Sequence, residues 1–209
     1  MKRNIQWKSV IVFGILGLFL AGCAGGTKVV TTQEKYSPSF KAGEFSRYKG
    51  KKMVLSSFFN QAQNTKAYAY FSPDKKLTYE VNIQLETFYY NSFQKAFRHV
   101  GVNLVDYSYD DRHPYRHHHY WWGVPGPGAY RAPKGVSEFQ FTLLSMTDQE
   151  FRFKVTLFKE GESKFDKEYT VTMAAATSEN PAELEKRAYQ LVDLAFTTVL
   201  RDREFSRAF

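Results

Sequence analysis

The sequence predicts an α+β fold in which two helices pack on one face of a mainly antiparallel sheet. Apolar and polar residues alternate along three successive stretches between residues 136 and 173, which is typical of strands with one wet face. Apolar residues recur at helical spacing before residue 101 and after residue 180. Two helices that share one face of a sheet are the economical way to bury these surfaces.

The folded part is predicted to begin with strands. Residues 53–59 form an apolar run that ends at the polar stretch 60–64, and residues 67–71 form a second, short run before Ser72-Pro73-Asp74. Apolar runs bounded by turn residues favour strands.

A helix is expected over residues 77–100, because apolar residues recur at helical spacing and Gly101 is placed to end it. Residues 77–83 also alternate as in a strand, so a helix start near Gln84 is the alternative. A strand over residues 102–106 follows the helix.

Residues 107–135 show neither period and contain four of the seven Pro and four of the five His, which predicts a long aromatic and His-rich loop insertion. A three-stranded meander follows, with turns near Thr147 and at residues 159–162. The last helix begins at Asn180-Pro181, with Asn as cap, and ends among Arg201, Arg203 and Arg207.

The first 22 residues have the pattern of a secretory signal peptide. Lys2, Arg3 and Lys8 precede an apolar run over residues 10–20. As a helix, that run covers only about 16 Å of a hydrocarbon core that is about 30 Å thick. Residues 20–23, Leu-Ala-Gly-Cys, then resemble the bacterial lipobox.

This resemblance implies lipid attachment at Cys23, the only Cys of the chain, after removal of residues 1–22. Anchoring through two or more acyl chains is stable. Ala24 stands where retention in the inner membrane would call for Asp, so the resemblance favours the outer membrane, with the protein facing the periplasm.

Residues 23–51 are expected to be a lipidated, basic, flexible tether to a single domain over residues 52–209. Residues 24–52 carry seven basic and two acidic side chains, whereas residues 53–209 carry nineteen of each. The basic residues either rest on anionic headgroups or are merely solvated. A neutral domain argues against nucleic acid as a partner.

The body resembles small envelope lipoproteins with the fold of the TolB N-terminal domain, among them peptidoglycan-synthase activators, and the lipopolysaccharide-assembly lipoprotein has a comparable layout. The similar features are the helix that runs into residues 101–106, the hairpins over 139–167 and the C-terminal helix. The resemblance implies an α+β fold and an accessory role in the envelope, and the insertion at 107–135 departs from it.

The loop offers the candidate contact residues. Aromatic and arginine side chains are frequent at binding hot spots, and here they are Tyr115, Arg116, Tyr120, Trp121, Trp122 and Tyr130. Two alternatives are a loop that buries its own rings over the sheet, and metal capture by His113, His117, His118 and His119. Adjacent His residues do not by themselves converge on one centre, so no metal or other cofactor is predicted.

The chain is not expected to be an enzyme. It has no Gly-x-Ser-x-Gly motif and no Gly-rich phosphate loop, and His99 is expected to cap or pack a helix. The predicted function is that of a non-catalytic accessory or docking subunit for an envelope assembly or transport system. The alternative is a binding module for cell-wall glycan or lipopolysaccharide that uses the same loop.

Overall fold

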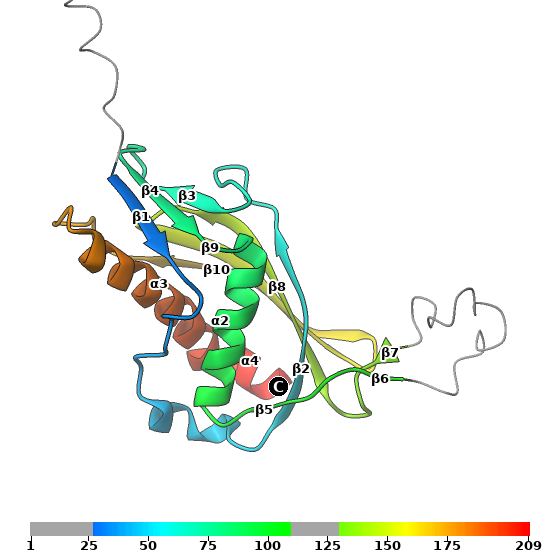
Figure 1. Ribbon diagram of the computed structural model, residues 1–209. Helices are drawn as coiled ribbons and strands as arrows, with labels where there is room; N and C mark the ends of the chain where they lie inside the picture. The colour runs from blue at the N-terminus through cyan, green and yellow to red at the C-terminus, as the bar shows by residue number, and fades with distance from the viewer. Residues whose placement is uncertain (1–26, 110–129) are drawn as a thin grey trace, which may run out of the picture.

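The structure, a computed structural model, describes residues 27–109 and 130–209. These residues form an α+β fold, as predicted, with a five-stranded sheet, a three-stranded sheet and a small ribbon (Figure 1). No helix among them is long and apolar enough to cross a membrane.

The five-stranded sheet has the order β10-β9-β8-β2-β5. The predicted meander is confirmed as the antiparallel strands β8 (Ser137–Met146), β9 (Glu150–Lys159) and β10 (Glu162–Thr172). The predicted early strand is β2 (Lys52–Asn60), which pairs in parallel with β8 and with the two-residue strand β5 (Asn103–Leu104). The sheet is therefore antiparallel on one side and parallel on the other.

The helices α2 (Leu85–His99), α3 (Pro181–Arg201) and α4 (Arg203–Ala208) lie on one face of this sheet (Figure 1). Aromatic rings fill the space between them: Phe97 of α2 lies 4.7 Å from Phe196 of α3 and 5.2 Å from Phe139 of β8, measured between ring centroids. Burial of each such ring contributes about 1.5–3 kcal/mol, so this layer is the main source of stability.

The helix predicted from residue 77 begins only at Leu85, so the alternative start near Gln84 is correct. Residues 77–81 instead form the strand β4, which pairs antiparallel with β3 (Ala69–Phe71). Tyr79 of β4 stacks on Tyr70 of β3 with ring centroids 4.8 Å apart, and both rings are buried. In an extended backbone the side chains of Tyr79 and Val81 point to the same side, and both are buried there. This burial favours a strand over a helix for residues 77–81.

The prediction of a flexible tether is wrong for residues 27–51, which are part of the fold. Strand β1 (Thr27–Thr31) pairs in parallel with β4, and the 3₁₀ segment η1 (Ala42–Tyr48) follows it. Val29, Tyr36, Phe45 and Tyr48 are almost completely buried. These apolar side chains outweigh the polar and basic residues around them, so the fold includes residues 27–51 as well as the predicted domain.

The predicted loop at 107–135 has regular structure at both of its ends. Strands β6 (Ser108–Tyr109) and β7 (Tyr130–Arg131) form a two-stranded antiparallel ribbon, with Ser108 opposite Arg131. This pairing fixes the two ends of the loop side by side. Residues 110–129 lie outside the described residues.

Candidate functional site

Most of the residues predicted to carry function lie outside the described residues: Cys23, Tyr115, Arg116, Tyr120, Trp121 and Trp122, together with His113, His117, His118 and His119. Tyr130 is placed only through its backbone in β7. What the structure does place are the segment that follows Cys23 and the ribbon from which the aromatic loop leaves.

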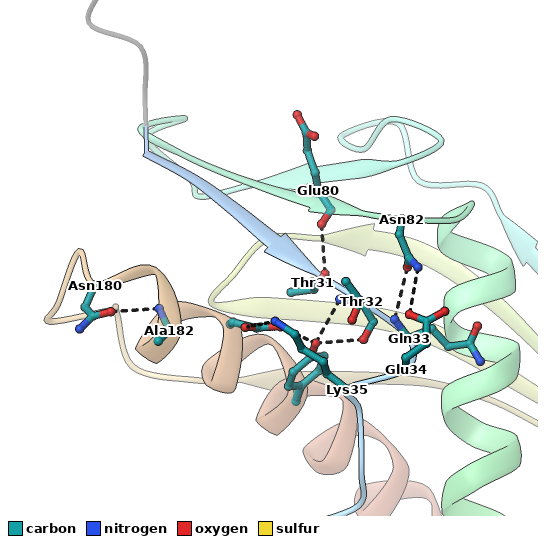
Figure 2. Close-up of polar contacts among 11 residues, drawn as sticks. Thr31, Thr32, Gln33, Glu34, Lys35, Glu80, Asn82, Asn180 and Ala182 are labelled. Carbon is teal, nitrogen blue, oxygen red and sulfur yellow. Dashed lines mark hydrogen bonds and ion pairs between the residues drawn. The ribbon is translucent and has the colours of Figure 1, made fainter.

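The N-terminal strap, defined here as residues 27–40, runs along β4 and then past α3 and α2 (Figures 1 and 2). Its strand β1 aligns Thr27 with Leu77 and Thr31 with Val81. The hydroxyl of Thr31 donates a hydrogen bond of 3.2 Å to the carbonyl oxygen of Glu80. The strap is thus tied to the small sheet from its first described residue.

Tyr189 of helix α3 binds the middle of the strap at Thr32. The Tyr189 hydroxyl accepts a bond of 3.1 Å from the Thr32 amide and lies 2.9 Å from the Thr32 carbonyl oxygen. Burial, together with the adjacent Glu185 carboxylate, raises the pKa of Tyr189 to about 12. Lys35 forms an ion pair of 3.1 Å with Glu185. The single hydroxyl proton of Tyr189 has two acceptors, the Thr32 carbonyl oxygen and the Glu185 carboxylate at 2.8 Å, so Tyr189 links the strap to Glu185 of the same helix.

A buried carboxylate on α3 holds the end of the strap. Asp193 is only 7% exposed and accepts hydrogen bonds from the Tyr36 hydroxyl at 2.8 Å, the Ser39 amide at 2.9 Å and the Ser39 hydroxyl at 2.5 Å. Burial, reinforced by the carboxylate, raises the pKa of Tyr36 far above its usual value. Hydrogen bonds to a charged acceptor are roughly twice as strong as neutral ones.

Helix α2 completes the attachment from the other side. The Lys95 ammonium donates to the carbonyl oxygens of Gln33 at 2.7 Å and Tyr36 at 2.9 Å. The Asn91 amide donates to the Gln33 side chain at 2.9 Å. Three separate elements therefore fix a segment that begins four residues after Cys23.

The ribbon of β6 and β7 is the base of the loop that holds the other candidate residues. Next to it, the Tyr107 hydroxyl donates a bond of 3.0 Å to the carboxylate of Glu138 on β8. In Figure 1 the ribbon lies on the opposite side of the molecule from the start of β1. The part of the chain closest to Cys23 and the base of the aromatic loop are therefore far apart.

A buried polar cluster joins the turn between β8 and β9 to α3. The Tyr79 hydroxyl donates to the Asp148 carboxylate at 3.3 Å, and the Arg187 guanidinium donates to the Asp148 carbonyl oxygen at 3.1 Å. Burial raises the pKa of Asp148, whose residue is 3% exposed. With so little access to solvent, the cluster is suited to holding the turn rather than to binding a substrate.

Two further polar features are exposed. A shallow depression near the C-terminus is lined by Lys159, Lys164, Glu204, Arg207 and Ala208. The ring of His99 lies 3.0 Å from the Phe40 carbonyl oxygen and packs edge-on against the Phe40 ring, as expected for a packing residue. Across residues 27–109 and 130–209, no three His, Cys, Asp or Glu side chains gather as a metal site.

Asp193 and Lys95 were not predicted to be important from the sequence. A signal existed for Asp193, because it falls on the apolar stripe of the helix, beside Val192 and Ala195. A carboxylate at such a position is rarely buried without partners. Nothing in the sequence indicated which residues those partners are.

Comparison with known proteins does not assign the chain to a family. No family model and no curated protein matches the chain. A solved structure of a Xanthomonas campestris protein, described under the family model DUF330, matches with a TM-score of 0.43 and 7% sequence identity. The match covers 84% of this chain and 95% of that protein.

Proposed function

We propose that this chain is a lipid-anchored envelope protein without catalytic activity. It serves as an accessory or docking subunit for an envelope assembly or transport system. The lipid on Cys23 inserts into the outer membrane, and the domain faces the periplasm. The observation that carries the proposal is the opposite placement of two regions: the start of β1, four residues from Cys23, and the ribbon that bears the aromatic loop (Figure 1).

The placement of the strap supports the anchor. Thr27 is at the beginning of an edge strand, so a lipid on Cys23 is next to the surface of the domain and does not have to pass through it. The contacts to Tyr189, Asp193 and Lys95 keep the strap attached to α3 and α2 when its N-terminal end is tethered to the membrane by the lipid.

The ribbon supports the docking role. It joins residues 109 and 130, so the loop with Tyr120, Trp121 and Trp122 leaves and returns at one place. A loop attached on the side away from the anchor can reach a periplasmic partner. Aromatic side chains supply large contact area at a small cost in conformational entropy.

Crosslinking in living cells tests the docking role. A photoreactive residue in place of Trp121 is expected to capture one specific envelope protein, identified by mass spectrometry. A photoreactive residue at Glu168, on the solvent-exposed side of β10, is the matched control and should not capture that protein. If both positions give the same background, the docking role is wrong.

Binding to cell-wall glycan or lipopolysaccharide is the second candidate, favoured by the combination of flat aromatic side chains with Arg116 in one loop. Sedimentation with isolated cell wall distinguishes the two. A docking subunit stays in solution, whereas a glycan-binding module sediments and loses this property when Tyr120, Trp121 and Trp122 are replaced by Ala.

A further inference from the structure

We infer that the outer face of the three-stranded sheet β1-β4-β3, with the turn before β4, lies against the anionic headgroups of the membrane. This inference rests on the proposed lipid anchor and adds the orientation of the domain to it. It identifies the partner of that surface as a phospholipid layer rather than a protein.

Chain length limits how far the sheet can be from the bilayer. Four residue steps separate Cys23 from Thr27, and a fully extended chain covers at most about 3.6 Å per residue, or about 14 Å in all. Because β1 is paired along its whole length with β4, no further chain is released to extend the link. Strand β1 of the small sheet is therefore the described element closest along the chain to Cys23.

The pairing register decides which side chains are on the outer face. Val29, Tyr79 and Tyr70 are buried and face the core. Their neighbours alternate to the opposite face, and these are Lys28, Val30, Thr78, Glu80 and Phe71. Val30 is 50% exposed, one of the few large apolar residues in the described chain with that much contact with solvent.

Basic side chains surround this apolar area. The ammonium of Lys66 lies 5.6 Å above the centre of the Phe71 ring, and Lys28 is 2.6 Å from Glu80. The turn before β4 adds Lys75 and Lys76 against Asp74. Four basic and two acidic residues leave a positive excess, which suits a negatively charged headgroup layer next to apolar side chains.

The test places a fluorescent label on the acylated full chain in vesicles of phosphatidylcholine and phosphatidylglycerol. Cys23 is the only Cys and is blocked by its lipid, so Val30→Cys supplies a single reactive thiol. The matched variant, Glu162→Cys, lies at the start of β10, next to the end of β9 that is farther from the small sheet. Phe71 of the small sheet forms a bridge with Thr147, close to the start of β9, whereas Glu162 pairs with Lys159 at the end of β9. The length of β9 separates the two positions by about 30 Å, at about 3.3 Å per residue.

Quenching by nitroxide lipids labelled at the headgroup gives the result. We expect quenching at position 30 to be about threefold stronger than at position 162, and to weaken when phosphatidylglycerol is left out. Equal quenching at both positions in protein that floats with the vesicles overturns the orientation while the anchor stands. Protein that carries no acyl chain and does not float overturns the proposed function, and the orientation with it.

Discussion

At the scale of single residues, Asp193 has the largest consequence for the attachment of the N-terminal strap. Its buried carboxylate accepts three hydrogen bonds from two residues of the strap. If the carboxylate is removed, the Tyr36 hydroxyl and the Ser39 amide lose their acceptor in a place that water hardly reaches. A buried donor left without an acceptor lowers the free energy of unfolding by more than the net contribution of the hydrogen bond that was removed.

Asp193→Ala is therefore expected to lower the free energy of unfolding by about 3 kcal/mol, measured by urea denaturation and circular dichroism. Asp166→Ala is the control, because Asp166 lies on the exposed face of the sheet, where it pairs with Lys154 and accepts a long hydrogen bond of 3.4 Å from Thr156, and its loss should cost less than about 1 kcal/mol. Equal losses in the two variants would show that Asp193 does not hold the strap.

Asp202 gives a prediction about pH. Burial opposes its ionisation, but hydrogen bonds from Lys167 and Tyr169, at 2.8 and 2.9 Å, outweigh burial and lower its pKa. A lowered folded-state pKa means that the stabilisation is present above the unfolded value of about 3.9 and is lost as pH falls through the folded value.

Asp202→Asn keeps the acceptor for the backbone amide of Glu204 but removes the charge. We expect it to reduce the free energy of unfolding at pH 7 by about 1–2 kcal/mol. The difference from the wild type should shrink as pH falls below the unfolded value of about 3.9 and vanish once pH is below the lowered folded-state pKa of Asp202. A difference that is constant with pH would mean that the charge of Asp202 contributes nothing.

At the scale of elements, the sequence predicted the strands and helices with a clear period, and missed those that depend on distant partners. The meander and the Asn180-Pro181 helix start are confirmed, with the Asn180 side chain accepting from the Ala182 amide at 3.0 Å (Figure 2). Strand β1 has only five residues and pairs with β4, fifty residues away. Local composition there resembles a linker, because the burial of Val29 depends on a tertiary contact.

Two neighbouring residues of β1 test whether the strap belongs to the fold. Val29 is fully buried and Val30 is half exposed, so Val29→Ala should lower the free energy of unfolding by about 2 kcal/mol and Val30→Ala by less than about 0.5 kcal/mol. Urea denaturation of the two variants is the measurement. If neither changes stability, residues 27–31 are the flexible tether that the composition favoured.

At the scale of the whole molecule, the start of β1, which follows the proposed anchor, and the ribbon of β6 and β7 lie on opposite sides (Figure 1). The sequence alone predicted both Cys23 and the aromatic loop, because a lipobox and a cluster of aromatic residues are local patterns. Their separation was not predictable. It follows from the packing of β1 on β4 and from the ribbon that joins residues 109 and 130, and both are contacts between distant parts of the chain.

Intact mass spectrometry of the chain purified from bacterial membranes shows directly whether the protein is a lipoprotein. We expect a protein that begins at Cys23 and carries the added mass of a diacylglyceryl group and an N-linked acyl chain. The Cys23→Ser variant should lack this mass and leave the membrane fraction. A chain that retains residues 1–22, or one with an unmodified Cys23, would mean that the protein is not held by a lipid at Cys23.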